Sequence, residues 1–284
     1  PEPPEGAAER RKRAVVLRRV LQYAAIVAVI LSCVYFFLKP IGSMDDLAIA
    51  YVDITIPNER GVMLTLADGE KVVVGNEKRE VIFEKTGNVN IKQEGRNELV
   101  YENVKISEKR NVEEEAMNEI TVPAGERVSI ILSDGTKVWL NSESAIRYPV
   151  RFGIGKRVVT VKGNVYFEVT KDVSRPFFVV MKDMETEVLG TSFEVNTYGD
   201  HGEIYMALVE GCVRVRSGNH VVVAKPNEQV ALDLESRKIS TKEVDAARLV
   251  AWKDGVLMIK NEPFVDVIRR LERWFGVEIE NQCL

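Results

Sequence analysis

Residues 128–140 read VSIILSDGTKVWL, and this stretch does most to decide the fold. Two short apolar-rich segments flank Ser133-Asp134-Gly135, which is the pattern of two antiparallel strands joined by a tight turn. Asp-Gly is favoured at such turns because both residues tolerate the positive φ that the turn requires. The stretch therefore predicts a β-hairpin with strands over 128–132 and 136–140.

A second copy of this unit lies earlier in the chain. Residues 56–76 align without gaps with residues 122–142, at an offset of 66 residues, and the Asp-Gly pair is among the identical positions. Two copies of a hairpin do not by themselves establish a solenoid. Residues 107–119 (SEKRNVEEEAMNE) are polar and rich in charge, which indicates a linker or an exposed loop. We therefore expect a first hairpin unit with its linker over 44–119.

Short strand-like segments continue through a β domain that we expect over 120–243. They are separated by Gly, Asn and Asp, and their regular spacing predicts an all-β sandwich, a barrel or a β-helical stack. Trp139, Phe167 and Phe193 stand among apolar neighbours and are expected in the core. The predicted strands cover 157–162, 165–170, 177–181, 185–189, 192–198, 203–209, 212–216, 220–224, 228–234 and 238–241.

The C-terminal residues 252–284 predict a small, truncated β-α-β domain. Residues 256–260 and 277–280 have strand character, and between them Pro263 suits the first turn of a helix that Gly276 caps. Apolar side chains repeat on one face of this helix. They either pack on the domain's own sheet, which we prefer, or form a partner-binding surface. The candidate partner-binding residues are Trp252, Phe264, Ile268, Leu271 and Trp274.

A membrane segment is predicted near the N-terminus. Residues 20–38 (VLQYAAIVAVILSCVYFFL) contain no charge, and at about 1.5 Å per residue a helix of this length crosses the hydrocarbon core of a bilayer. Residues 1–19 are basic, which places them in the cytoplasm and the remainder outside. A buried core helix would be more amphipathic. The alternative is a lipoprotein signal, because Ile30-Leu31-Ser32-Cys33 resembles a lipoprotein cleavage box; we prefer a retained helix because the apolar stretch is long.

Composition and motifs favour recognition over catalysis. The 284 residues carry 39 Lys and Arg against 43 Asp and Glu, and the excess of acid lies beyond the membrane segment, which argues against nucleic acid as a ligand. His201 and His220 are the only histidines, and the three cysteines lie far apart, so no metal site is expected. No nucleotide-binding or hydrolase motif occurs. We therefore expect that the protein has no cofactor and is not an enzyme.

Several stretches, taken in order, resemble the FecR-like family of transmembrane anti-sigma factors. The resemblance covers about residues 120–280, with Gly163-Asn164-Val165 departing from the family's usual Gly-Glu-Ala. The C-terminal part resembles the short N-terminal module of secretins and TonB-dependent receptors. The stretches are LSDGTKVWLN (132–141), RYP (147–149), GNVYFEV (163–169), RPF (175–177), VLGTSF (188–193), VEG (209–211) and AWKDG (251–255).

The resemblance implies a signalling protein of the bacterial inner membrane with its bulk in the periplasm. Its partners would be an extracytoplasmic-function sigma factor, bound through a region preceding Pro1, the signalling domain of an outer-membrane TonB-dependent receptor, and membrane lipid. It would control genes for the uptake of iron chelates or glycans. The alternative function is a membrane-tethered module that binds glycan or another envelope component; an envelope hydrolase is a third hypothesis.

The resemblance also implies a site of self-cleavage. Members of the family can break a Gly-Thr bond in the outer domain, and Gly190-Thr191 matches that pair. The Thr191 hydroxyl would attack the Gly190 carbonyl, and water would then open the ester. Such a break is a single turnover. The alternative is that Gly190 ends one strand and Thr191 begins the next.

Overall fold

The fold is taken from a computed structural model, which describes residues 51–56, 61–74, 81–84, 89–94, 98–103 and 116–280. The predicted basic segment 1–19 and membrane segment 20–38 lie outside these residues. Among the helices of the described ranges, none is long and apolar enough to cross a bilayer.

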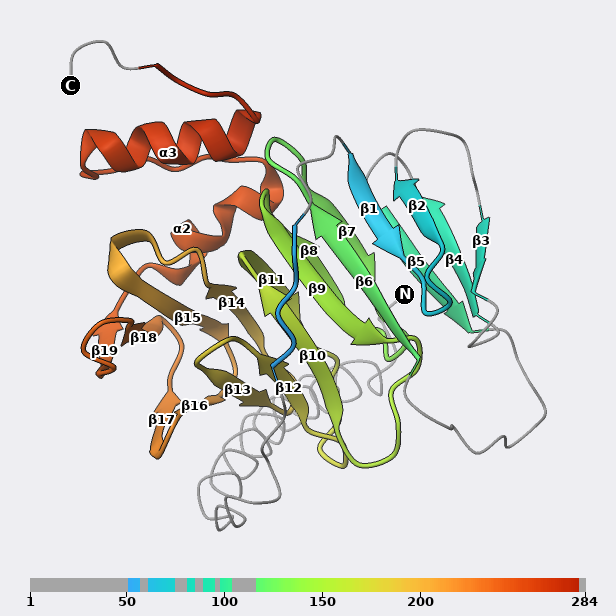
Figure 1. The fold of residues 1–284 in the computed structure, drawn as a ribbon. Helices are drawn as coiled ribbons and strands as arrows, with labels where there is room; N and C mark the ends of the chain where they lie inside the picture. The colour runs from blue at the N-terminus through green and yellow to red at the C-terminus, as the bar shows by residue number, and fades with distance from the viewer. Residues whose placement is uncertain are drawn as a thin grey trace, which may run out of the picture. The chain divides into compact units, whose positions relative to one another are not determined.

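The described chain is mainly β and forms two large sheets (Figure 1). Neighbouring strands pair antiparallel except for β10 with β12 and β5 with β7. In spatial order, the first sheet, sheet A, contains β17 (His220–Ala224), β16 (Val213–Ser217), β13 (Glu185–Val188), β12 (Phe177–Val180), β10 (Arg157–Lys162), β9 (Ser144–Pro149), β6 (Met117–Val122), β1 (Val62–Thr65) and β2 (Lys71–Val74). Sheet B contains β19 (Ile239–Glu243), β18 (Glu228–Asp233), β15 (Glu203–Glu210), β14 (Ser192–Asn196), β11 (Asn164–Glu168), β8 (Lys137–Leu140), β7 (Val128–Ile131), β5 (Glu98–Asn103), β4 (Val89–Glu94) and β3 (Val81–Glu84).

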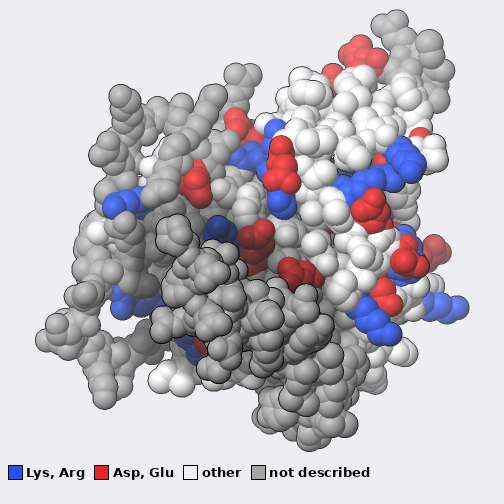
Figure 2. Space-filling view, turned by 180° about the vertical axis from the view of Figure 1, so that it is seen from behind, with Lys and Arg blue, Asp and Glu red and all other residues white. Residues whose placement is uncertain are grey.

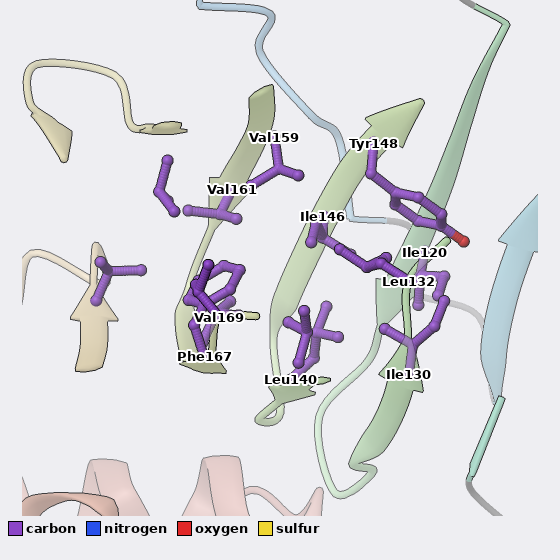
Figure 3. Packing of buried hydrophobic residues seen from close by; sticks show 14 of the residues in the cluster. Ile120, Ile130, Leu132, Leu140, Ile146, Tyr148, Val159, Val161, Phe167 and Val169 are labelled. Carbon is purple, nitrogen blue, oxygen red and sulfur yellow. The ribbon is translucent and has the colours of Figure 1, made fainter. Parts of the chain in front are cut away.

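The hydrophobic core lies between the two sheets, so the fold is a sandwich rather than a β-helical stack. Alternate residues along a strand point to opposite faces, and one set from each sheet is buried. Ile146 and Val161 of sheet A point toward Leu140 and Phe167 of sheet B (Figure 3). Phe167 and Phe193 are both fully buried and stack at 5.3 Å between ring centroids, which confirms their predicted place in the core.

Both predicted hairpins form, and they lie in opposite sheets. β1 and β2 are the counterparts of β7 and β8 at the offset of 66 residues that the sequence showed. β1–β2 belongs to sheet A, with β2 at its edge, whereas β7–β8 belongs to sheet B. The copies therefore face one shared core from opposite sides.

Two predictions in this region are wrong. Trp139 is only half-buried and lies outside the main core, because Val138 and Leu140 of the same strand occupy the inward positions. Of the predicted linker or exposed loop 107–119, residues 107–115 lie outside the described residues, and the end is strand, since β6 begins at Met117 and Asn118 is fully buried. β6 pairs with β1, so the boundary expected at residue 119 falls inside a strand of a continuous sheet.

The C-terminal part contains the predicted helix without the predicted strands. After α2 (Ala246–Leu249) and the short η3 (Val250–Asp254), helix α3 runs over Phe264–Phe275, and Gly276 caps it at φ 64°. Residues 256–260 and 277–280 pair with no strand of the described chain, which corrects the β-α-β prediction. A strand requires a neighbour to bond its backbone, and the sequence pattern alone could not supply one.

Candidate functional site

The face of sheet B that points away from the core carries a row of polar side chains. Asn164 stands opposite Asn196, and Asn196 stands opposite Tyr205, in the register of three adjacent strands. Asn141, the residue after β8, extends the row, and its N–H donates to the Asn164 carbonyl at 3.0 Å. These side chains point away from the core because side chains alternate along a strand and the neighbouring Val165 and Val195 are in the core.

A second, more apolar row lies beside the first and is covered by η3. Trp139, Tyr166 and Glu194 occupy successive strands in register. Trp252 packs with Tyr166 and donates its indole N–H to Glu194 Oε1 at 2.8 Å. Glu194 is 1% exposed. Burial raises its pKa to about 7, although the Trp252 and Asn164 hydrogen bonds oppose the shift.

Helix α3 is attached to the sandwich mainly through Arg273. Its guanidinium donates to Glu143 at 2.8 Å and to Asp200 at 3.0 Å, and it lies 3.6 Å from the centre of the Tyr198 ring. Arg127 stacks on the Trp274 ring at 3.7 Å in the same contact. Both guanidinium groups therefore make cation–π contacts, and Arg273 also pairs with two carboxylates.

A pair of glycines permits this close approach. The Gly125 N–H donates to the Arg273 carbonyl at 2.9 Å. A Cβ on Gly276 would lie 2.9 Å from the Ala124 carbonyl oxygen, and one on Gly125 would lie 3.0 Å from Gly276. Both residues also have positive φ. A larger residue at either position would push the helix terminus away from the sandwich.

A cavity of about 240 Å³ lies between the sandwich and the C-terminal segment. The polar row forms one side, and Trp252, Trp274 and residues 256–258 contribute apolar walls. Four arginines and four carboxylates also line it, and several are paired with each other. No group of three or more potential metal ligands occurs in the described ranges.

The five candidate partner-binding residues do not share one surface. Trp252 is buried, and Ile268, Leu271 and Trp274 are half-buried, whereas Phe264 is 67% exposed. Phe264 belongs to an exposed apolar surface on α3 and its flanking segments, where Figure 2 shows a mainly uncharged area. That surface, termed the α3 surface below, comprises Val256, Met258, Ile259, Phe264, Val265, Phe275 and Val277.

Gly190 and Thr191 lie between β13 and β14. Gly190 has φ 151°, and a Cβ there would lie 2.6 Å from the Lys171 Cα, so the site requires glycine. The Thr191 hydroxyl is buried and donates to the Cys212 carbonyl at 3.1 Å. A Cβ on Gly211 would lie 2.9 Å from this hydroxyl. Gly211 thus packs against Thr191, and Gly190 packs against Lys171.

Sequence reasoning missed Glu194 and the polar row as parts of a site. The signal was present as Asn141, Asn164 and Asn196, each at an outward position beside a core valine or leucine. Which strands bring these residues together depends on the order of strands in sheet B, which periodicity does not specify.

Comparisons with known proteins agree on one family. The model of the family described as FecR protein matches residues 118–214. Two crystal structures of one protein are also similar to this chain, with 34% sequence identity and a TM-score of 0.54. That protein is assigned as an anti-sigma factor of Parabacteroides distasonis ATCC 8503, and the structures have resolutions of 2.50 and 1.65 Å. The two alignments cover 57% and 56% of this chain, and each covers 76% of the Parabacteroides protein. A search of curated proteins found no match.

The family match falls on the sandwich, from β6 to β16, which includes Gly190-Thr191 and the outward rows of sheet B. The alignment with the Parabacteroides protein, at 34% identity, covers three quarters of that relative. On this ground the chain belongs to the FecR family of anti-sigma factors.

Proposed function

We propose that this anti-sigma factor is a membrane-anchored transducer. It would hold an extracytoplasmic-function sigma factor on the cytoplasmic side and respond to an outer-membrane TonB-dependent receptor on the other. The genes controlled would serve the uptake of a nutrient, an iron chelate or a glycan. Family membership supports the sigma-factor partner, and the uncharged segment 20–38 behind basic residues 1–19 supports the anchor.

The observation that carries the receptor side of the proposal is the α3 surface. Phe264 is 67% exposed and Phe275 is 62% exposed, at opposite ends of one helix. Exposed apolar patches on a domain surface mark interaction sites, whereas single exposed apolar side chains are common. Aromatic anchors of this kind supply much of the energy of protein interfaces. We assign this surface to the signalling domain of the receptor.

The experiment replaces Phe264 by Asp and measures sigma-dependent transcription with a promoter reporter in cells that contain the receptor. Addition of the imported nutrient should no longer change transcription, because a buried charge would oppose the contact. The matched control is Ile154→Asp, since Ile154 is fully exposed on the sandwich, outside the α3 surface. A Phe264→Asp variant that responds like the wild type would exclude the α3 surface as the receptor site.

We also propose a single-turnover break at Gly190-Thr191. The Thr191 Oγ1 adds to the Gly190 carbonyl carbon, the C–N bond breaks, and the Thr191 nitrogen takes the hydroxyl proton. Water then hydrolyses the ester to a Gly190 carboxyl group and a free Thr191 hydroxyl. The absence of a Cβ at Gly190 supports the proposal, because nothing on that residue blocks the attack and the chain itself holds the Thr191 hydroxyl next to the Gly190 carbonyl.

Mass spectrometry of the full chain tests this break. Cleavage yields fragments of 190 and 94 residues of the 284. Thr191→Ala should abolish the fragments, Thr191→Ser should retain some, and Ser192→Ala, which removes the neighbouring hydroxyl, should leave them unchanged. An intact wild-type chain, or fragments from Thr191→Ala, would leave Thr191 as an ordinary packing residue.

A further inference from the structure

The cavity above sheet B has a floor of carboxamides. Asn164 on β11 and Asn196 on β14 line it together with Asn141, which directly follows β8, and Tyr205 on β15 is next to Asn196. Each carboxamide offers both hydrogen-bond donors and an acceptor. Neighbouring strands are about 4.8 Å apart, so the carboxamides follow one another at about that spacing.

The oxygen of one of these amides lacks a hydrogen-bond partner. Asn196 donates to the Tyr205 hydroxyl at 3.3 Å and accepts from the Tyr198 N–H, and Asn141 accepts from the Ser142 N–H. In contrast, Asn164 Oδ1 has no hydrogen-bond partner among the described residues, although Asn164 is only 6% exposed. Buried polar atoms are nearly always hydrogen-bonded, so this oxygen favours a ligand that donates a hydrogen bond.

The charges around the cavity favour an uncharged ligand. The four arginines and four carboxylates that line it cancel in formal charge. Three of the arginines are already paired: Arg273 with Asp200 at 3.0 Å, Arg269 with Asp266 at 3.3 Å, and Arg270 with Glu262. An anion that bound to any of these three arginines would have to compete with the carboxylate already paired with it.

The walls and the size restrict the ligand further. Trp252, Trp274 and Leu257 provide apolar surface opposite the amides. The volume of about 240 Å³ is below the roughly 300–1,000 Å³ of sites for drug-sized ligands. The ligand is therefore small, with hydroxyl groups on one edge and C–H groups on another.

From these observations we propose that the cavity binds a small, uncharged, hydroxyl-rich molecule of the size of a single sugar ring. The three carboxamides bond its hydroxyl groups, and Asn164 Oδ1 accepts one of them. Because the sandwich and residues 256–274 both line the cavity, a bound ligand would stabilise their contact. This inference goes beyond the proposed receptor relay and does not depend on it.

The test is a titration of the full chain in a detergent without a sugar headgroup. The probes are D-glucose, D-galactose and N-acetyl-D-glucosamine at roughly millimolar concentrations, followed by saturation-transfer difference NMR and by the melting temperature. At least one of these sugars should bind saturably and raise the melting temperature. Asn164→Ala should weaken that binding at least tenfold.

Asn219→Ala is the matched control, because Asn219 is exposed between β16 and β17 and does not line the cavity. Asn164→Leu keeps a side chain of similar shape and removes both the accepting oxygen and the amide donors, so it replaces Asn164→Ala if the latter fails to fold. The proposal is overturned if no sugar binds saturably, if Asn219→Ala weakens binding as much as Asn164→Ala, or if inorganic phosphate or L-glutamate binds more tightly than every sugar.

Discussion

The hairpins β1–β2 and β7–β8 have the same local structure and different surroundings. In both, the N–H of the turn glycine donates to a leucine carbonyl at 2.9 Å, and the turn aspartate accepts from a backbone N–H at 3.0 Å. The difference lies beyond the turn. Asp134 also binds the buried Arg157 at 2.7 Å, whereas Asp68 is exposed at an edge of sheet A. Local sequence thus specifies a hairpin, and tertiary position determines how much each residue stabilises the fold.

The largest expected difference is between Asp134→Ala and Asp68→Ala. Removal of Asp134 leaves the Arg157 charge buried without its partner, which should lower the free energy of unfolding by about 3–5 kcal/mol. Removal of Asp68 costs one exposed hydrogen bond, about 0.5–1.5 kcal/mol. Urea unfolding of the two variants measures both values. Equal losses would show that the Arg157 pair does not distinguish the hairpins.

The two hairpins should be equivalent where both face the core. Leu64 and Ile130 occupy matching positions, and both are 0% exposed. Truncation of either residue to Ala should cost about 2–5 kcal/mol, since each leaves a cavity in the same core. Melting temperatures of Leu64→Ala and Ile130→Ala should therefore fall together. A much smaller loss for Leu64→Ala would mean that the first hairpin is not part of one cooperative core.

Glu194 provides a contrast with Asp134, because the hydrogen bond to it comes from the Trp252 indole and not from a guanidinium. Its pKa in the fold, raised to about 7, exceeds the ordinary value of 4.5. The folded state then binds the proton more tightly than the unfolded state, so stability is highest below pH 4.5 for this group and falls as pH rises toward 7. At about 1.36 kcal/mol per pH unit, the loss is roughly 3 kcal/mol.

Glu194→Gln should remove this part of the pH dependence. Thermal unfolding measured between pH 4.5 and 8 compares it with the wild type and with Glu235→Gln, an exposed control. If the wild-type and Glu194→Gln curves run parallel, Glu194 does not titrate as described.

The smallest expected difference between the two hairpins concerns the turn glycines. Gly69 and Gly135 have φ 88° and 83°, so Ala at either position should cost about 1–2 kcal/mol. A Cβ on Gly135 would also lie 3.3 Å from Thr170 Oγ1, while a Cβ on Gly69 meets no atom within 4 Å. Gly135→Ala should therefore be the more destabilising in urea unfolding. The reverse order would contradict the packing at the second turn.

The sequence predicted what depends on near neighbours in the chain. Both hairpins, helix α3 and its cap at Gly276 follow from turn chemistry and apolar periodicity. It did not predict β9 as a strand or the docking of α3, because Arg273 contacts residues 73 and 130 positions away. The candidate site was missed for the same reason, since Asn141, Asn164 and Asn196 meet only through strand order.

We propose that one membrane helix separates the sandwich from the sigma factor. A reporter enzyme that is active only outside the cytoplasm tests this claim when it is fused at two places. We predict activity for a fusion after Ser43 and none for a fusion before Arg10, because the basic residues 1–19 hold the N-terminus inside. Activity before Arg10 with none after Ser43, or equal activity at both places, would contradict the account.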